Sequence, residues 1–500
     1  MLSLSLRFSA RRDPAHTVFA VLAMAALPCP AWAEDAPPPV PPQAIIEVPA
    51  TPLTLPAVPA ADFWSGFRSP QLTALIAQGV AANQDIASAT ARLAAARARL
   101  GAAKARLLPS VGVVLNGQKN ITLSGDIVQS GLQPSAELDV GYDLDLFGAN
   151  RANKRAEKAR TAASALDLAA LRLSLASEIA KAYVNLSALD AEMATMNVQL
   201  ALVQRLAKLV DIRTKEGESG AFESGLIVQQ LVSVRAQQEI MAQSRIDIVA
   251  SLAVLLGQEP QQFTLTPMPF NQLTVPALAD TQPTDLLARR PDVLAAQQRM
   301  VASKWDAEAV HRSRLPSLRL SAAGIVGLLT GGGGLGSLAT VGGTMATALF
   351  QGGAITARNK EAKAVAQDAL AGYRKIQLTS LREAVSSLAA QNSARTREGL
   401  WFQSIEAVGK SARVAQSAYL EGEVAINLVV DARGNEIASR RNLIQARRDR
   451  LNAAIDVFRA MGGPPESTAP VPMASASPAA SPGNSPVPSD NHPPPPSNYR

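Results

Sequence analysis

The chain has 500 residues, of which 47% are hydrophobic and only 4% aromatic, and its formal net charge is +7 at pH 7. This length allows a large core, but a low aromatic content with abundant alanine suits closely packed helices better than the core of a globular enzyme. The charge is modest for this length, and basic residues alternate with acidic ones. This pattern favours solvated helix faces and argues against a nucleic-acid-binding surface.

Residues 1–33 have the pattern of a secretory signal peptide. Basic residues precede the apolar run TVFAVLAMAAL, and Ala31-Trp32-Ala33 offers an A-x-A cleavage site. The only cysteine, Cys29, lies inside this segment, after a proline where lipid attachment requires a small residue, so we expect no lipidation. If cleavage follows Ala33, the mature chain has no thiol for a disulfide or a metal site.

The rest of the chain divides by composition and by internal repetition. Residues 34–61 are a proline-rich extended segment, and residues 464–500 are a Pro/Ser-rich tail that we expect to be disordered. Between them, two halves repeat each other at a period of about 207 residues, as the pairs Asp85/Asp292 and Pro109/Pro316 show. We predict a first structural repeat over 62–257, a linker over 258–282 and a second repeat over 283–463. The period is too long for a solenoid unit.

Each half begins with a helix and then a pair of strands. In the first half, Glu137 to Phe147 reads ELDVGYDLDLF, with apolar residues on one face and Asp139, Asp143 and Asp145 on the other. Its expected partner begins at Val111. In the second half, Ser317 to Leu329 and Leu338 to Phe350 flank the glycine run 331–334, a hairpin signal. Four strands cannot close a barrel, whereas three chains would supply twelve.

A long helical hairpin follows each strand pair. Ala149 to Glu216 contains neither glycine nor proline, which allows about 100 Å of helix. Apolar residues recur there at alternating spacings of four and three, which predicts a coiled-coil seam. Its members are Leu175, Ile179, Ala182, Leu186, Leu189, Met193, Met196, Leu200, Val203, Ala207 and Val210. After a break over 217–225, a second helix runs from Leu226 to Leu256. The second half repeats this plan over Ala354 to Met461, with its break at Gly422. Both hairpins are expected to point the same way.

Several motifs, taken in order, resemble the TolC-like outer-membrane efflux protein family, in the NodT/OprM branch that serves resistance-nodulation-division (RND) pumps. They are FW at Phe63-Trp64, NQDIASATARLAAARARL, LLPS, DLDLFG, ARRPDVLAAQ, LPSL, LFQGG and YLEGEVAINLVVDAR. The resemblance spans Asp62 to Gly463. It implies an α+β membrane protein, a homotrimer whose twelve-strand outer-membrane β-barrel, with four strands per chain, is continuous with a coiled-coil α-helical barrel projecting into the periplasm.

The resemblance also implies a function and its partners. The protein would be the outer-membrane channel of a tripartite RND-type efflux system, a passive duct held in outer-membrane lipid. It would carry drugs, toxic compounds or metals from an inner-membrane RND pump and a periplasmic adaptor (a membrane fusion protein) to the exterior. Two alternatives stay open: the duct of a type I protein secretion system, and a non-conducting trimeric structural coiled coil.

Site residues follow from this arrangement. The adaptor is expected to dock on the hairpin tips, formed by Gly217, Glu218, Gly220, Gly422 and Glu423. Glycine would relieve backbone strain in these turns. Glu423 and Asp431 are the candidate gate residues. Asp139, Asp143 and Asp145 would line the barrel lumen and bias the passage of ions.

An enzyme function finds no support in the motifs. His16 lies in the signal peptide, His492 in the tail, and His311 stands alone near the second LPS motif. A nucleophile, a base and an orienting group cannot be assembled from these residues, so we expect no catalytic site, no cofactor and no metal. The run GGGGLGSLA lacks the lysine and the helix of a phosphate-binding loop, and we interpret it as a hairpin turn.

Overall fold

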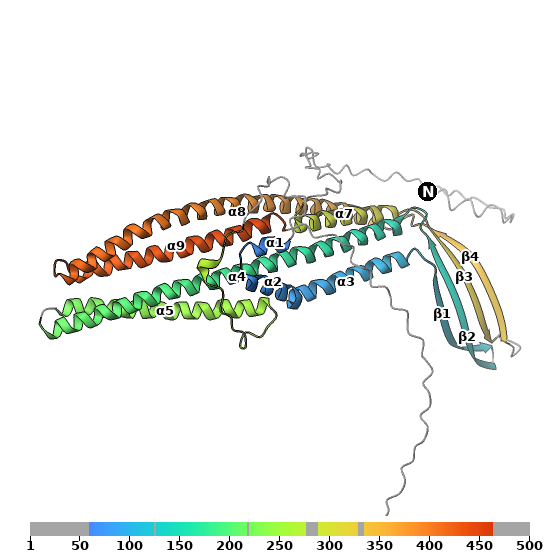
Figure 1. The fold of residues 1–500 in the computed structure, drawn as a ribbon. Helices are drawn as coiled ribbons and strands as arrows, with labels where there is room; N and C mark the ends of the chain where they lie inside the picture. The colour runs from blue at the N-terminus through green and yellow to red at the C-terminus, as the bar shows by residue number, and fades with distance from the viewer. Residues whose placement is uncertain (1–59, 125–126, 218–219, 277–288, 329–334, 464–500) are drawn as a thin grey trace, which may run out of the picture. The chain divides into compact units, whose positions relative to one another are not determined.

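The computed structural model describes residues 60–124, 127–217, 220–276, 289–328 and 335–463, all within the unit Thr54–Arg500. The predicted signal peptide, Cys29, the proline-rich segment up to residue 59, Glu218, the glycine run 331–334 and the tail lie outside the described residues. Figure 1 shows the order of the elements along the chain. In the first half they are α1 (Ala60–Ser65), α2 (Pro70–Ala82), α3 (Gln84–Ala105), β1 (Ser110–Ser124), β2 (Ile127–Leu144), α4 (Ala149–Lys215), α5 (Ala221–Leu255) and the 3-10 helix η1 (Phe270–Gln272). In the second half they are α7 (Pro291–Arg312), β3 (Ser317–Leu328), β4 (Leu335–Ala346), α8 (Ala354–Leu420) and α9 (Ile426–Ala460).

Three helices of the first half have counterparts of equal length in the second half. Helices α3 and α7 have 22 residues each, α4 and α8 have 67 each, and α5 and α9 have 35 each. Each long helix of the second half begins 205 residues after its counterpart, at 354 against 149 and at 426 against 221. The repeated sequence motifs therefore correspond to repeated structure.

The four strands form one antiparallel sheet in the order β1-β2-β3-β4, which leaves β1 and β4 as its edges. The predicted pairing of the segment at Val111 with β2 is confirmed, since Val111 lies opposite Val140. The predicted strand bounds need correction. Strand β2 starts at Ile127, ten residues before the predicted Glu137, and ends at Leu144, while β4 starts at Leu335 and ends at Ala346. Pairing with β1 extends β2 back through Gly131 and Pro134, two residues that are unfavourable in a strand and hid it from the sequence pattern.

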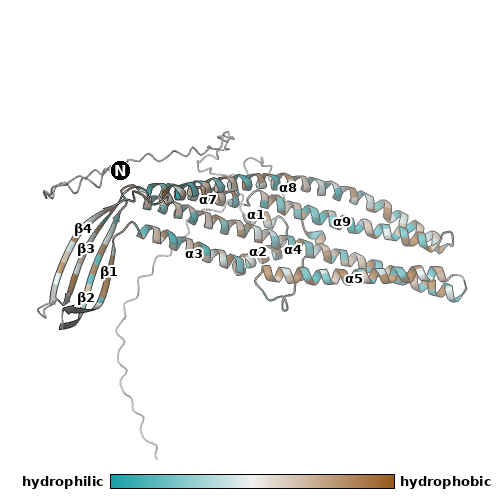
Figure 2. Ribbon diagram, turned by 180° about the vertical axis from the view of Figure 1, so that it is seen from behind, coloured by the Kyte–Doolittle hydropathy of each residue, from teal (hydrophilic) through white to brown (hydrophobic). Residues whose placement is uncertain are grey.

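The sheet has one apolar face and one polar face, and Figure 2 shows hydrophobic and hydrophilic residues interleaved along its strands. Residues directly opposite in register share a face, as do Val113, Leu138 and Gly324. The apolar face is exposed, with exposed fractions from 42% to 87%, in Val111, Val113, Leu115, Leu138, Leu320, Val326, Val341 and Met345. The opposite face carries Asp139, Asp143 and Arg319.

The long helices form a row. Helix α5 packs on α4, α4 on α9, and α9 on α8, so that α5 and α8 lie at the two flanks. The predicted seam of α4 is confirmed, because every member of it is buried or half-buried. Helix α5 begins at Ala221, five residues before the predicted Leu226, because Gly225 is accommodated inside the helix. Among the described residues, no helix has the length and apolar character needed to cross a membrane.

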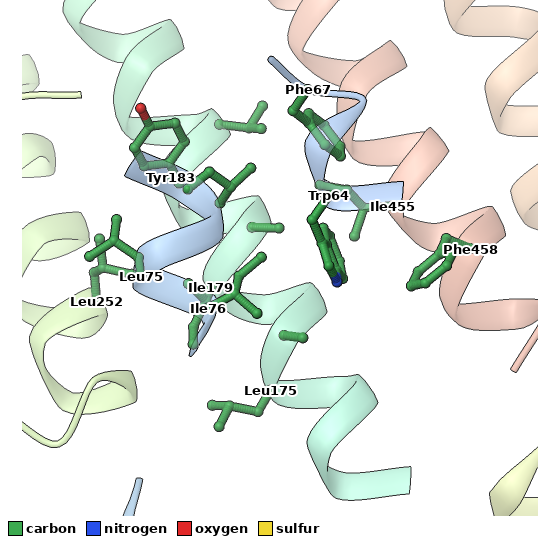
Figure 3. Packing of buried hydrophobic residues seen from close by; sticks show 14 of the residues in the cluster. Trp64, Phe67, Leu75, Ile76, Leu175, Ile179, Tyr183, Leu252, Ile455 and Phe458 are labelled. Carbon is green, nitrogen blue, oxygen red and sulfur yellow. The ribbon is translucent and has the colours of Figure 1, made fainter. Parts of the chain in front are cut away.

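The main core lies where α1 and α2 pack across α4, α5 and α9, with Trp64, Phe67, Ile179 and Phe458 among its members (Figure 3). Tyr183 is fully buried at its edge. Its hydroxyl accepts a hydrogen bond from the Met268 backbone N–H at 2.9 Å and donates one to the Gln71 side-chain oxygen at 2.8 Å. The tyrosine therefore fixes the segment after α5 against α4 without leaving a buried polar group unsatisfied.

A similar hydrogen-bonded contact occurs in both halves. It joins the second helix of each hairpin, α5 or α9, to the helix that leads to the sheet, α3 or α7. Asn83, the N-cap of α3, donates from Nδ2 to the carbonyl oxygen of Leu255 at the end of α5, over 3.1 Å. At the equivalent place in the second half, Arg290 donates to the carbonyl oxygen of Ala460 at 3.5 Å and pairs with Asp292 at 2.7 Å and Glu383 at 2.8 Å. Burial opposes the charge of Arg290, but the two carboxylates raise its pKa above the ordinary value.

Candidate functional site at the helical hairpin tips

The first tip is a short turn between α4 and α5. Its Gly217 has a φ of 81°, a left-handed conformation that favours glycine. Gly220 has a φ of −90°, which any residue can adopt, so the prediction that it relieves backbone strain is wrong. It stands instead at the N-cap of α5, where its small size leaves the helix N-terminus uncovered.

The second tip closes α8 with a Schellman motif. Gly422 has a φ of 79°, and its N–H donates to the carbonyl oxygen of Tyr419 at 3.1 Å, while the N–H of Glu423 donates to that of Ala418 at 2.8 Å. These bonds use backbone groups alone. The Glu423 side chain is therefore not needed for the turn, and it is exposed.

The two tips pack against each other. Leu206 and Val210 of α4 and Ile227 of α5 form one buried cluster with Tyr419 of α8 and Ile426 of α9. Val429, which is fully buried, completes it. The prediction that both hairpins point the same way is thereby confirmed. Because the cluster joins both hairpins, a displacement of one tip must disturb the other.

One side-chain contact between the tips was missed by sequence reasoning. The Arg213 guanidinium of α4 lies over the Tyr419 ring at 4.9 Å from its centroid, within cation–π range. Tyr419 is 2% exposed, and its hydroxyl has no hydrogen-bond partner among the described residues. The tyrosine begins the motif YLEGEVAINLVVDAR, but nothing in the sequence pairs it with an arginine about two hundred positions earlier.

The candidate gate residues are two carboxylates at and beyond the second tip. Glu423 lies in the turn and Asp431 lies on α9, five residues after Ile426. Both side chains are exposed, and in the described part of the chain neither forms a hydrogen bond or an ion pair through its carboxylate. Both are thus available to a partner or to a second copy of the chain.

A polar layer follows the tip cluster along the helices. Glu436 of α9 is 7% exposed and accepts hydrogen bonds from Arg433 at 2.7 Å and from Arg440 at 3.0 Å. Burial alone would raise the pKa of the Glu436 carboxyl, but the two guanidinium groups hold it below its ordinary value. Further along, Glu192 of α4 lies 3.5 Å from Arg441 of α9. These groups keep paired charges between helices where the seam is otherwise apolar.

The three aspartates predicted for the lumen do not lie together. Asp139 and Asp143 are on the polar face of β2, and the Asp143 carboxylate lies 3.9 Å from the Arg319 guanidinium. Asp145 lies beyond the end of β2. It accepts hydrogen bonds from the backbone N–H groups of Asn150 at 3.0 Å and Arg151 at 2.8 Å, at the start of α4. It is a helix-capping residue, which corrects its placement on the strand.

The remaining candidates are His311 and any cluster of side chains that could bind a metal. His311 is exposed near the end of α7, and its ring contacts the Arg314 guanidinium at 3.1 Å. Within the described residues, no three His, Cys, Asp or Glu side chains gather closely enough to hold a metal ion.

Comparison with known proteins places these features in a family context. Residues 75–258 and 283–463 match the model of the family described as outer membrane efflux protein. The chain is 25% identical over 420 residues to the pyoverdine export outer membrane protein OpmQ of Pseudomonas aeruginosa, covering 80% of this chain and 87% of that protein. Among solved structures, the outer-membrane channel OprN matches with a TM-score of 0.73 and 25% identity, over 80% of this chain and 92% of that one. The outer membrane protein VceC of Vibrio cholerae has the same fold, with a TM-score of 0.72 and 23% identity, over 81% of this chain and 99% of VceC.

Proposed function

This chain belongs to the outer membrane efflux protein family, and we propose that it is the outer-membrane channel of a tripartite RND-type efflux system. It acts as a passive duct that carries drugs, toxic compounds or metals from an inner-membrane pump and a periplasmic adaptor to the exterior. One observation supports this proposal above all. In the described part of the chain, both the sheet and the row of long helices have unpaired edges, which further copies of the chain can cover. No catalytic step is part of the mechanism.

The open edges support a closed ring of copies. Within the described residues, strands β1 and β4 have no neighbouring strand on their outer sides, and an unpaired strand edge invites another strand. Three chains joined β4 to β1 would close twelve strands into a barrel and remove every edge. Such a head-to-tail contact joins two different surfaces, the β4 edge of one chain and the β1 edge of the next. The ring closes only if the repeated rotation from chain to chain leads back to the first chain.

The flanking helices support the same ring. The outer side of α5 exposes large apolar side chains, in Phe222, Val228, Val232, Ile240, Ile246 and Val254. Phe222 and Ile240 are 18 residues apart, which is five helical turns, so they share a face. Helix α8 exposes Leu378, Val385, Leu400 and Val414. We propose that the α8 face of one copy covers the α5 face of the next, giving a twelve-helix tunnel.

The exposed apolar face of the sheet supports insertion in a bilayer. The strands contain 12 to 18 residues, and a tilted strand needs only about 10 residues to cross the hydrocarbon layer. A monomer in water would leave Val113 and Val341 solvated, at 68% and 87% exposure. In a barrel these side chains contact lipid, and the polar face with Asp139 and Asp143 lines the lumen.

The oligomeric state tests this arrangement. We expect the protein, extracted from isolated outer membranes in mild detergent, to have the native mass of a trimer. Val385→Glu should shift it toward smaller species because it places a charge in the α8–α5 contact, whereas Ala390→Glu, about 140° round the same helix, should not. A water-soluble monomer, or another stable stoichiometry in the unmodified protein, would contradict the proposed barrel.

We also propose that the duct is closed at rest by the converging tips and opens when adaptor and pump engage them. Glu423 and Asp431 then act as gate carboxylates, and Arg213 on Tyr419 holds the two hairpins of one chain together. Gly217, Gly220, Gly422 and Glu423 form the docking surface, together with Glu218, which lies outside the described residues. The equal lengths of the three paired helices support the division into repeats at 62–257 and 283–463.

Charge reversal at the second tip tests the docking surface. Glu423→Lys should weaken binding of the periplasmic adaptor by about 10-fold and lower export in proportion. The introduced lysine would repel the basic groups of the adaptor that the acidic tip is proposed to attract. The turn itself should persist because its hydrogen bonds come from the backbone. Glu406→Lys, on α8 about four turns before the tip, serves as the control and should leave both measurements unchanged. Equal adaptor binding and export in the two variants would reject docking at this tip.

A further inference from the structure

The foot of the sheet contains a cavity that the proposed duct does not by itself explain. It has a volume of about 420 Å³ and lies between the end of α7, the start of β3, the end of β4 and the start of α8. Its polar lining consists of Ser313, Arg314, Ser317, Thr347, Gln351 and Arg358. Two guanidinium groups, three hydroxyls and an amide thus line one space. The hydroxyls of Ser313 and Ser317 already donate to the backbone oxygens of Val310 and Ala346, so the guanidinium groups are the main donors left for a ligand.

The two arginines of the cavity differ in their ion pairing from three other arginines near the foot of the sheet. Arg151, Arg312 and Arg319 each have a carboxylate partner in their own chain, at 3.2, 2.6 and 3.9 Å. In contrast, no ion pair within the described residues joins Arg314 or Arg358 to a carboxylate. Arg314 donates to the backbone oxygen of His311 at 3.2 Å, which anchors its side chain and leaves its charge uncompensated. The cavity therefore holds two unneutralised cationic groups.

The position of the cavity follows from the register of the strands. Ser317 and Ala346, which line it, are opposite each other at the foot of β3 and β4. Side chains alternate along a strand, so Ser317 lies on the same face as Arg319, and Arg319 is opposite Asp143. The sheet therefore contributes its polar face to the cavity, not the apolar face that contacts lipid.

We propose that Arg314 and Arg358 form an anion-binding site at the foot of the barrel, which takes carboxylate or phosphate groups of solutes passing through the duct. This inference rests on the proposed trimeric duct, in which the polar face is the lumen and three copies give six guanidinium groups at one level. Guanidinium groups bind oxyanions through charge-assisted, often bidentate hydrogen bonds. A ring of like charge in a confined passage also raises the local concentration of counter-ions.

Ion permeation through the trimer tests the site. Purified trimer in planar bilayers, with the periplasmic adaptor added to open the tips, should show a chloride-to-potassium permeability ratio that falls by at least about two-fold in the double variant Arg314→Gln/Arg358→Gln. Citrate and inorganic phosphate should both block the unmodified channel, and the concentration for half-block should rise about 10-fold in the double variant. The double lysine variant keeps the charge and should retain the permeability ratio, while losing part of the block because lysine cannot bind in a bidentate way.

Matched controls separate the possible outcomes. Arg299→Gln removes the same charge from α7 about four turns away, where the arginine pairs with Asp167, and should change neither measurement. If the double glutamine variant conducts with unchanged selectivity and unchanged block, the anion site is rejected and the duct is retained. If it loses trimer stability with unchanged block, the arginines are subunit contacts and the site is likewise rejected. Absence of conductance in the unmodified trimer with the adaptor bound would reject the duct itself.

Discussion

Replacing Phe458 with alanine is expected to lower the free energy of unfolding by about 3–5 kcal/mol, the usual cost of removing a large aromatic side chain from a core. Phe458 is 6% exposed, and its ring stacks on that of Phe63 with 3.8 Å between centroids and 2° between planes. It also meets the Trp64 ring edge-on at 5.2 Å. The substitution would therefore open a cavity between α1 and the end of α9, at the contact that joins these two helices.

The measurement is urea unfolding of the purified protein in mild detergent, followed by helical circular dichroism. Phe458→Leu keeps most of the buried volume and should cost less than about 1.5 kcal/mol. A similar loss in both variants would mean that the aromatic contacts, and not the apolar volume that leucine keeps, supply most of the stabilisation. A loss below about 1 kcal/mol for alanine would show that this part of the core rearranges freely.

Replacing Gly257 with alanine should cost about 2–4 kcal/mol, because two penalties add. Gly257 has a φ of 69°, and a left-handed conformation costs a residue with a Cβ about 1–2 kcal/mol. An added Cβ would also lie 2.5 Å from the carbonyl oxygen of Ala82, a backbone atom that cannot move without shifting α2. The equivalent Gly462 has a φ of 85°, and a Cβ added there would lie 3.0 Å from the Cα of Arg290, so Gly462→Ala should respond in the same direction.

Gly101 provides the matched control for this second prediction. It lies inside α3, and a Cβ there would meet nothing within 4 Å, so Gly101→Ala should raise the free energy of unfolding by about 0.5–1 kcal/mol. Thermal unfolding of the three variants side by side compares the two junctions with an open helix position. If Gly257→Ala were as stable as Gly101→Ala, the close approach of the returning helix to α2 would not exist in solution.

The elements that the sequence predicted best are those with a strong local pattern. The absence of glycine and proline over 149–216 predicted a helix that the structure ends at Lys215, one residue earlier. The alternating spacing of apolar residues predicted which face of α4 is buried. The strand over 137–147 was found by its alternation, but its bounds were wrong. Pairing with β1 extends it backwards, and the hydrogen bonds of Asp145 to α4 end it.

The tip residues also divide into those that a local sequence pattern predicted and those that it did not. Glycine at 217 and 422 could be assigned to turns because a left-handed residue commonly ends a helix. The contact of Arg213 with Tyr419 could not be predicted, because it joins segments about two hundred residues apart and has no sequence pattern. The uncompensated charges of Arg314 and Arg358 were hidden for the same reason, since each is defined by which carboxylates of other segments lie near it.

The sequence alone thus determined the type of each major element, the length of α4, the duplication of the chain and the family it resembles, because these depend on periodicity, glycine and proline positions and repeated motifs. Only the tertiary structure decided that the helices lie in the row α5–α4–α9–α8, that β2 joins β3 across the two halves, and which charges are paired. These properties arise from contacts between distant segments, whose geometry is set by packing and by the satisfaction of buried polar groups.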